Sequence, residues 1–474
     1  MAASARAPRA SRKARGQFFT PTEVAEALLR RAAQDLAEAG ESVPRGDVLD
    51  PACGDGAFLT AAAVAGWAAP HRLRGRDTDA SVLDGPPGAA LDVGDGLALD
   101  GPFDAVVGNP PFGGRGVRDR PPDALEALGR RLSIHRADPR GELRPGRSVP
   151  PRFPVATLFV DRFVAAARPG GVVGLVLPAS FLANRRDEGP RAWLLRRVRL
   201  VAVDALAPGT FSAAGTRAHT VFVLGVRRPD VLPSLDAALT DPPVRLGDGV
   251  GRRSVPVAQL LGARRWDPRY HDPRWDAELA TVRRPLRPLG EFIAELAYGA
   301  IKPGAAPRPA QEGRPAALYV TQRAITDGGI DLEACPRIVA ERPWDGPRYR
   351  LAPGDLALPR SGAGTLGRNR LTRFDGAPHP AVVDCFTDRV SLRGISSAWV
   401  LGFLRSPPGW AQIQRTFNGV GTPNLSFDEI RGLRVPVPTV AEARAAEAAW
   451  ARVAAGRAPF DALRAVVSGE DSSH

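Results

Sequence analysis

Short apolar runs alternate with segments of helical spacing over roughly the first half of the chain. The runs 48–49 and 103–108 are continuous apolar stretches of strand length, as expected for strands buried on both faces. Before them, residues 22–39 carry apolar side chains near a helical period, with Thr22 as the expected cap. The alternation continues to about residue 226. It predicts an α/β fold, with a mostly parallel sheet that has helices on both faces.

Acidic residues stand where three of these strands are expected to end. Asp50 opens a turn that runs to Gly56, Asp77 and Thr78 follow the next run, and Asp95 follows a third. The turn lacks the spacing G-x-G-x-x-G, and its acids would repel a pyrophosphate. A cationic nucleoside such as S-adenosylmethionine fits better, with the acid at the second strand end on the ribose hydroxyls. Each acid alone is equally compatible with a solvated loop; their order is the stronger observation.

The run 103–108 ends in Asn109-Pro110-Pro111-Phe112. The prolines fix the backbone and carry no N–H group, so this is a rigid loop that displays a side-chain acceptor, a carbonyl and a ring face. Such a set suits a planar group with an amino substituent, for example adenine. The simpler alternative is a turn stiffened by proline and anchored by a buried phenylalanine.

Together these motifs resemble the amino-group DNA methyltransferases of restriction-modification systems, of the adenine-N6 type. The family's opening motif is matched by residues 16–21, which include Thr20 and Pro21, and its glycine-rich motif by residues 50–56. The resemblance implies a Rossmann-like methyltransferase sheet ending in an antiparallel hairpin, with strands near 201–203 and 220–224. It implies that Phe211 supplies a second aromatic ring for the target base. The implied S-adenosylmethionine contacts are Thr20, Pro21, Asp50, Pro51, Ala52, Gly54, Gly56, Asp77, Thr78 and Asp95.

The resemblance also implies a mechanism. The Asn109 side-chain oxygen and the Pro110 carbonyl would accept the two hydrogens of the target amino group, and Pro111 would keep the loop rigid. Phe112 would stack on the adenine after it leaves the duplex. Flipping a base costs a few kcal/mol, and stacking returns about 1–3 kcal/mol per base.

The chain of 474 residues carries a net charge of +13, almost wholly from arginine, since Lys13 and Lys302 are its only lysines. A basic protein rich in arginine suggests a polyanionic partner, here double-stranded DNA. Codon bias would explain the choice of arginine over lysine but not the excess of base over acid. The three cysteines and six histidines form no metal or disulfide pattern. We see no membrane span and no secretory signal, and therefore expect no membrane partner and a cytoplasmic location.

The length predicts two domains. We expect a basic, disordered leader at 1–15, a catalytic domain at 16–226 with a mobile lid or DNA-contact loop at 113–152, and a linker at 227–284. The strings from 285 to 440 resemble the target-recognition domain of type I specificity subunits, and imply an α+β domain in which Gly419 and Asn424 are structural. Residues 441–474 predict a helix or helix pair packed on that domain, followed by a tail.

Other functions remain open. The same catalytic string occurs in enzymes that methylate RNA bases or protein glutamine, although those enzymes have a small second domain or none. Methylation of a cytosine amino group, or a non-catalytic DNA-binding subunit of a defence complex, is also compatible with parts of the sequence. A separate restriction endonuclease as partner stays possible. The sequence names neither the recognition site nor the residues that read bases.

Overall fold

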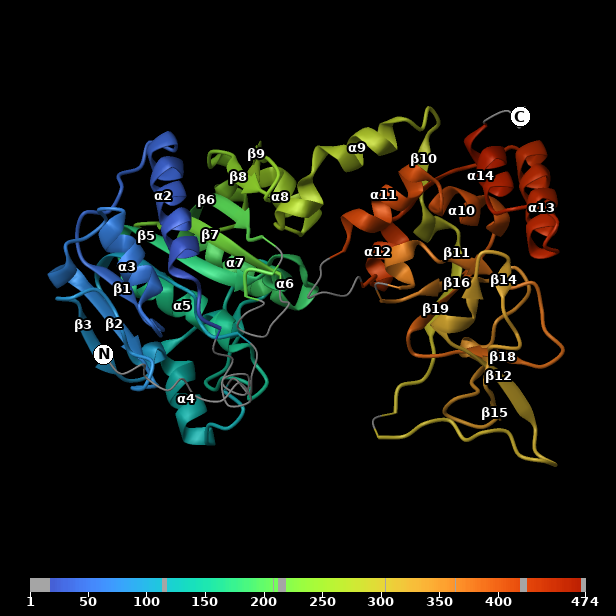
Figure 1. Cartoon of the computed structure of the whole chain (residues 1–474), viewed down its shortest axis with the longest axis horizontal. Coiled ribbons are helices and arrows are strands. Elements are labelled where there is room, and N and C mark those ends of the chain that lie inside the picture. The colour runs from blue at the N-terminus through green and yellow to red at the C-terminus, as the bar shows by residue number, and fades with distance from the viewer. Residues whose placement is uncertain are drawn as a thin grey trace. The chain divides into compact units, whose positions relative to one another are not determined.

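The computed structural model divides into two compact units, residues 1–271 and 272–474 (Figure 1). It describes residues 18–112, 117–207, 209–211, 219–302, 304–362, 364–417 and 424–469. The expected leader at 1–15, and Gly419, lie outside these residues. No helix of the described ranges is long and apolar enough to cross a membrane.

Unit 1 is built on one mixed sheet of nine strands in the order β3-β2-β1-β4-β5-β7-β6-β8-β9. The strands from β3 to β5 are parallel, and β7 is antiparallel to both of its neighbours, β5 and β6. This arrangement confirms the predicted Rossmann-like methyltransferase fold and its antiparallel hairpin. The strands are β1 (Val48–Asp50), β2 (Leu73–Asp77), β3 (Ala90–Val93), β4 (Phe103–Gly108), β5 (Ala167–Pro178), β6 (Val198–Ala205), β7 (Thr220–Arg227), β8 (Val244–Gly247) and β9 (Arg252–Val255).

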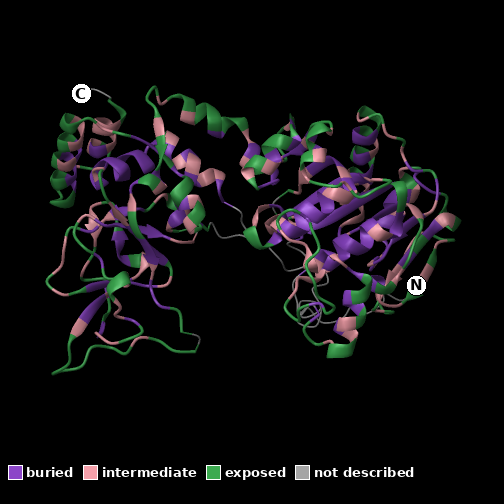
Figure 2. Cartoon of the chain, turned by 180° about the vertical axis from the view of Figure 1, so that it is seen from behind, coloured by how far each residue is buried: buried purple, intermediate pink, exposed green. Residues whose placement is uncertain are grey.

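Helices cover both faces of this sheet, as expected. Successive residues of a strand point to opposite faces, so Val48 packs in one hydrophobic cluster with α2 and α3, while Leu49 packs in another with α4, α5 and α7. Figure 2 shows the central strands as buried. The helices are α2 (Thr22–Glu38), α3 (Ala57–Val64), α4 (Pro122–Arg131), α5 (Val155–Ala166), α6 (Ala179–Ala183), α7 (Glu188–Arg197) and α8 (Val257–Ala263).

Two local expectations for unit 1 are wrong; of the third, the lid or DNA-contact loop at 113–152, only the mobile lid is contradicted, and DNA contact stays a prediction. Thr22 is the first residue of α2 rather than its cap, because the extended Pro21 occupies the cap position. Residues 227–271 are no linker, since β8 and β9 extend the catalytic sheet. The described part of the expected lid, 117–152, contains α4 and buries apolar side chains in the core, because Leu125, Leu128 and Leu132 share one face of an amphipathic segment.

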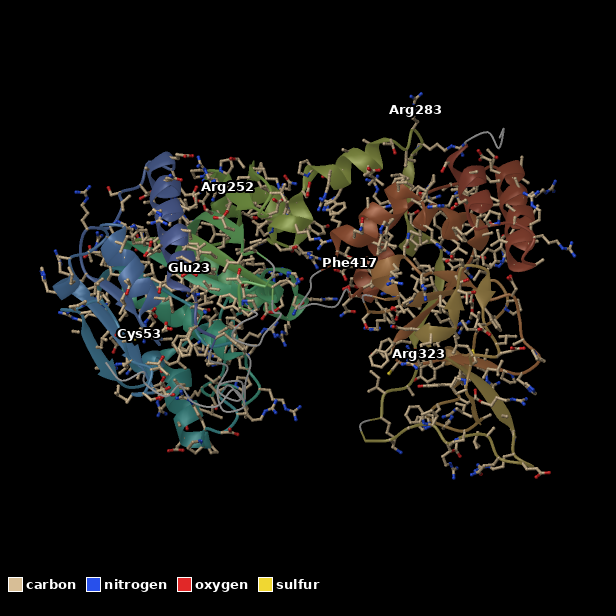
Figure 3. All side chains as sticks on the ribbon, in the orientation of Figure 1. Glu23, Cys53, Arg252, Arg283, Arg323 and Phe417 are labelled. Atoms are coloured by element: carbon tan, nitrogen blue, oxygen red, sulfur yellow. The ribbon has the colours of Figure 1, made fainter. Side chains whose placement is uncertain are left out.

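The added strands β8 and β9 are joined to the rest of unit 1 by charge. Arg252 of β9, labelled in Figure 3, pairs with the buried Asp35 of α2 at 2.5 Å and with Asp204 of β6 at 2.8 Å. Arg245 of β8 also reaches Asp35 at 3.4 Å. The two pairs made by Asp35 link residues more than 200 positions apart, so no local sequence pattern indicates them.

Unit 2 is an α+β domain, as the resemblance implied. Its main sheet has the order β11-β19-β16-β17, a second sheet has the order β15-β12-β18, and β10 pairs with β20. Its strands are β10 (Leu286–Pro288), β11 (Ile293–Tyr298), β12 (Ala316–Val320), β13 (Ile325–Thr326), β14 (Gly329–Ile330), β15 (Arg337–Val339), β16 (Leu356–Pro359), β17 (Thr372–Arg373), β18 (Ala381–Val383), β19 (Thr387–Leu392) and β20 (Arg434–Pro436).

The C-terminal segment forms the expected helix pair. Helices α13 and α14 pack on α10, and Trp450 and Leu463 are buried in the same cluster as the main sheet. The pair therefore belongs to the core of unit 2. The helices of this unit are α9 (Pro273–Ala280), α10 (Ser397–Leu404), α11 (Pro407–Arg415), α12 (Phe427–Gly432), α13 (Val440–Ala454) and α14 (Asp461–Ser468).

Candidate functional site

Four of the predicted site residues come together because parallel strands end at one edge of the sheet. Asp50 and Asp77 are the last residues of β1 and β2, Asp95 lies two residues beyond β3, and Asn109 directly follows β4. They line a cavity of about 310 Å³. The predicted residues in its lining are Thr20, Asp50, Pro51, Ala52, Gly54, Asp77, Thr78, Asp95, Asn109 and Pro111.

Five predicted residues lie next to this cavity rather than in its lining: Pro21, Gly56, Pro110, Phe112 and Phe211. Gly56 has a structural reason to be glycine, since it has φ +73° before α3 and a Cβ atom would meet the Asp84 carbonyl oxygen at 2.2 Å. Pro21 begins α2. Both residues shape the site without facing its cavity.

Gly54 is one of the glycines that line the cavity. It has φ +51°, and a Cβ atom there would lie 2.7 Å from the ring of Phe19, which also lines the cavity. Its N–H group donates to Asp77 Oδ2 at 3.0 Å, while the N–H group of Asp79 donates to Asp77 Oδ1 at 2.9 Å. Asp77 thus joins the turn after β1 to the end of β2, and burial raises its pKa.

Asp50 is the most deeply buried acid of the cavity, at 2% exposure. Its Oδ1 accepts a hydrogen bond from the N–H group of Ala52 at 3.0 Å. Burial is the main cause that raises its pKa from 3.8 to about 8, and the nearby carboxylates of Asp77 and Asp55 act in the same direction. Asp50 consequently favours the neutral form until a cation arrives beside it.

Asp95 makes one hydrogen bond and one ion pair. Its Oδ1 accepts the N–H group of Leu97 at 3.0 Å, and its Oδ2 pairs with Arg120 at 2.8 Å. Arg120 lines the cavity and brings a positive charge among acids. Sequence reasoning missed Arg120, because it lies in an arginine-rich segment where no spacing distinguishes one arginine from another.

Asn109 is fixed by the segment that precedes α2. Its Nδ2 donates to the Phe18 carbonyl oxygen at 2.8 Å and to Thr20 Oγ1 at 3.0 Å. Its Oδ1 is buried and accepts no hydrogen bond from any of the described residues. An unsatisfied buried acceptor costs about 1–3 kcal/mol, so this atom is available to a donor that enters the site.

Phe112 is surrounded by other aromatic rings. Phe18 stacks on it with ring centroids 5.3 Å apart, and Phe211 contacts it edge-on at 6.1 Å. Phe112 and Phe211 are buried, with 5% and 2% of their surface exposed. The structure therefore brings the two predicted stacking rings together, and the ring of Phe18 covers one face of Phe112. No spacing in the sequence indicates this contact.

The remaining chemistry of the site is simple. Cys53, labelled in Figure 3, lines the cavity, and burial raises the pKa of its thiol. It is a small neutral residue at pH 7. Among the described residues, no group of three histidine, cysteine or acidic side chains is placed to hold a metal ion.

Comparisons with known proteins support the resemblance. Residues 5–66 match the family model for N-6 DNA methylases. The chain is also similar to the type II methyltransferase M.TthHB8I of Thermus thermophilus, with 31% identity over 194 residues. That match covers 40% of this chain and 41% of the relative, so the chain is matched over less than half of the relative's length.

A solved structure shares the fold over nearly the whole chain. The type IIL restriction-modification enzyme MmeI, solved in complex with DNA, aligns with a TM-score of 0.54 and 10% identity. The alignment covers 97% of this chain and 76% of that enzyme. The chain thus resembles N6 DNA methyltransferases in sequence around the first motifs, and a restriction-modification enzyme in fold.

Proposed function

We propose that this protein is a DNA methyltransferase that transfers a methyl group from S-adenosylmethionine to the N6 amino group of a flipped adenine. A role in a restriction-modification or phage-defence system accompanies this proposal. The observation that carries it is the buried Oδ1 of Asn109, which accepts no hydrogen bond from the part of the chain that the structure describes and lies at a cavity lined by strand-end acids. A free acceptor suits a substrate that brings an amino group.

The cavity fits S-adenosylmethionine in size and donor chemistry. Its volume of about 310 Å³ lies at the lower end for ligand sites. Asp50 and Asp77 offer carboxylates to an ammonium group and to ribose hydroxyls, and Asp95 offers one to the adenine amino group. Gly54 leaves room that a Cβ atom would fill. Thr20, Pro51, Ala52 and Thr78 complete the contacts, and the bound cofactor supplies the activated methyl group.

The chain's own residues act on the acceptor. Asn109 Oδ1 and the Pro110 carbonyl would take the two amino hydrogens, which directs the nitrogen lone pair toward the methyl group. No base with an unusual pKa is needed, because catalysis of this kind is mostly positioning and charge stabilisation. The target base would displace the ring of Phe18, while the Phe18 backbone stays in place. The base would then stack on Phe112, with Phe211 at its edge.

Unit 2, from about residue 285 to 440, is the proposed target-recognition domain. Its loops meet at one end of the main sheet, where Gln322 Nε2 and the N–H group of Arg360 both donate to the Phe386 carbonyl oxygen, at 2.6 and 2.7 Å. Phe386 is 56% exposed and Arg323, labelled in Figure 3, is exposed. A cation, an amide and an apolar ring together suit the edges and phosphates of duplex DNA.

The test is a methyl-transfer assay with the full chain, labelled S-adenosylmethionine, and DNA from a strain that lacks the gene. We expect N6-methyladenine at one sequence motif. Asn109→Ala should abolish transfer while the cofactor Kd, measured by calorimetry, changes less than about threefold, because the amide acts on the substrate.

Other substrates would give different results in the same assay. Label in RNA or in a protein but not in DNA would identify one of the alternative methyltransferases. DNA binding with neither cofactor binding nor transfer would identify a non-catalytic subunit. N4-methylcytosine in place of N6-methyladenine would correct the base only.

A further inference from the structure

We infer that the segment Phe18 to Thr20 is a positioning element that holds the Asn109 amide in one of its two possible orientations. The inference rests on the proposed function of Asn109. Two atoms carry it: the Phe18 carbonyl oxygen and the Thr20 hydroxyl, which together take both hydrogens of Asn109 Nδ2.

The orientation follows from what each partner can do. A backbone carbonyl only accepts hydrogen bonds, so the nitrogen of the Asn109 amide has to face Phe18 O, at 2.8 Å. The Thr20 hydroxyl, which can donate or accept, then has to accept at 3.0 Å. With Nδ2 fixed on this side, Oδ1 is left on the other side without a partner among the described residues.

The opposite orientation would fail chemically. A flipped amide would bring Oδ1 against the Phe18 carbonyl, where two acceptors repel each other. It would also turn the NH₂ group toward the entering amino group, where two donors meet. Only the orientation held by this segment offers an acceptor to a substrate N–H group.

The same segment lines the cofactor cavity. Phe18, Phe19 and Thr20 all belong to its lining, and Thr20 is 5% exposed. The Asn109 contacts span about 90 positions of sequence, so they depend on how the segment before α2 sits against the end of β4. Thr20, which lines the cofactor cavity, thereby helps to set the orientation of the Asn109 amide that would face the substrate.

The experiment separates positioning from binding. Thr20→Val removes the hydroxyl and keeps the side-chain shape, Thr20→Ser keeps the hydroxyl, and Thr22→Val repeats the substitution where the described residues give the hydroxyl no hydrogen bond. Thr20→Ala serves in place of Thr20→Val if that variant does not fold. Each is assayed with the full chain, saturating S-adenosylmethionine, and duplex DNA containing 2-aminopurine beside the target adenine.

We expect Thr20→Val to slow single-turnover methylation by about tenfold, as for a lost hydrogen bond that leaves a buried donor unpaired. Base flipping, seen as 2-aminopurine fluorescence, and the DNA Kd should change less than about threefold. Thr20→Ser should restore the rate, and Thr22→Val should match the wild type.

Each other outcome has a definite meaning. A normal single-turnover rate for Thr20→Val, with an active wild-type protein, would overturn the positioning role and leave the proposed function intact. A slow rate that recovers fully at higher cofactor concentration would also overturn it, since Thr20 would then be only a cofactor contact. A wild-type protein that transfers no methyl group to DNA would refute the proposed function itself.

Discussion

Replacing Asp50 by asparagine should stabilise the protein at slightly alkaline pH while weakening its binding of a cationic cofactor. Asp50 has a pKa of about 8 in the fold because burial disfavours its charge, whereas in the unfolded chain it has its ordinary pKa of 3.8. The folded protein thus holds a proton that the unfolded chain has lost. Stability from this group is therefore full below about pH 4 and is lost as the pH rises toward 8.

The magnitude follows from the difference between the two pKa values. About four pH units correspond to at most ~6 kcal/mol, at ~1.4 kcal/mol for each unit. Asparagine has the same shape, keeps an oxygen for the Ala52 N–H group, and never carries the charge. Near pH 8 we expect Asp50→Asn to unfold with a free energy at least ~2 kcal/mol above the wild type, and near pH 4 the two should be similar.

The assay is native-state hydrogen exchange of the β1 and β4 amides from pH 4 to 9, because two units need not unfold together. Asp230→Asn, at an exposed acid, controls for the loss of one charge. Cofactor affinity is measured in parallel by calorimetry and should fall for Asp50→Asn. If the unfolding free energy of the wild type and of Asp50→Asn depended on pH in the same way, the reasoning would be refuted. It would also be refuted if Asp50→Asn were less stable than the wild type at pH 8.

Four further predictions follow from other parts of the structure. Gly54→Ala should weaken cofactor binding by at least tenfold in calorimetry, since it combines a positive φ with a contact on Phe19; unchanged affinity would contradict this. Arg252→Met should lower the unfolding free energy of unit 1 by about 2–3 kcal/mol in urea, because Asp204 loses its ion pair and the buried Asp35 keeps only the longer one with Arg245; a neutral result would make the network dispensable. Arg323→Ala should weaken binding to all DNA duplexes and should reduce the slope of log affinity against log salt concentration by about one. Arg444→Ala on α13 should change neither quantity. Exchanging residues 285–440 with those of a relative should transfer the methylated motif, and an active chimera that kept its motif would disprove the assigned role.

The sequence by itself determined the central features of unit 1. Apolar runs that end in a polar residue located β1 and β4, and with them Asp50 and Asn109. The order of acids at expected strand ends located Asp77 after β2. These features are readable because burial on both faces requires a continuous apolar run, and parallel strands place their carboxyl ends at one edge. The helix pair after residue 440 was readable for the same kind of reason, from its apolar spacing.

Tertiary structure alone decided the contacts that surround the site. The Phe18 carbonyl fixes the Asn109 amide, Arg120 pairs with Asp95, and Arg252 ties β9 to α2. Each contact joins groups that are distant in sequence. The chain has many carbonyl groups and arginines that could make such a contact, and the sequence does not distinguish among them. The composition of residues 227–271 likewise suggested a linker, although two strands formed there, because a short edge strand with charged residues has no apolar run to reveal it. The local sequence pattern indicates which side chains of a segment are buried. Only the tertiary structure determines which distant residues those side chains contact.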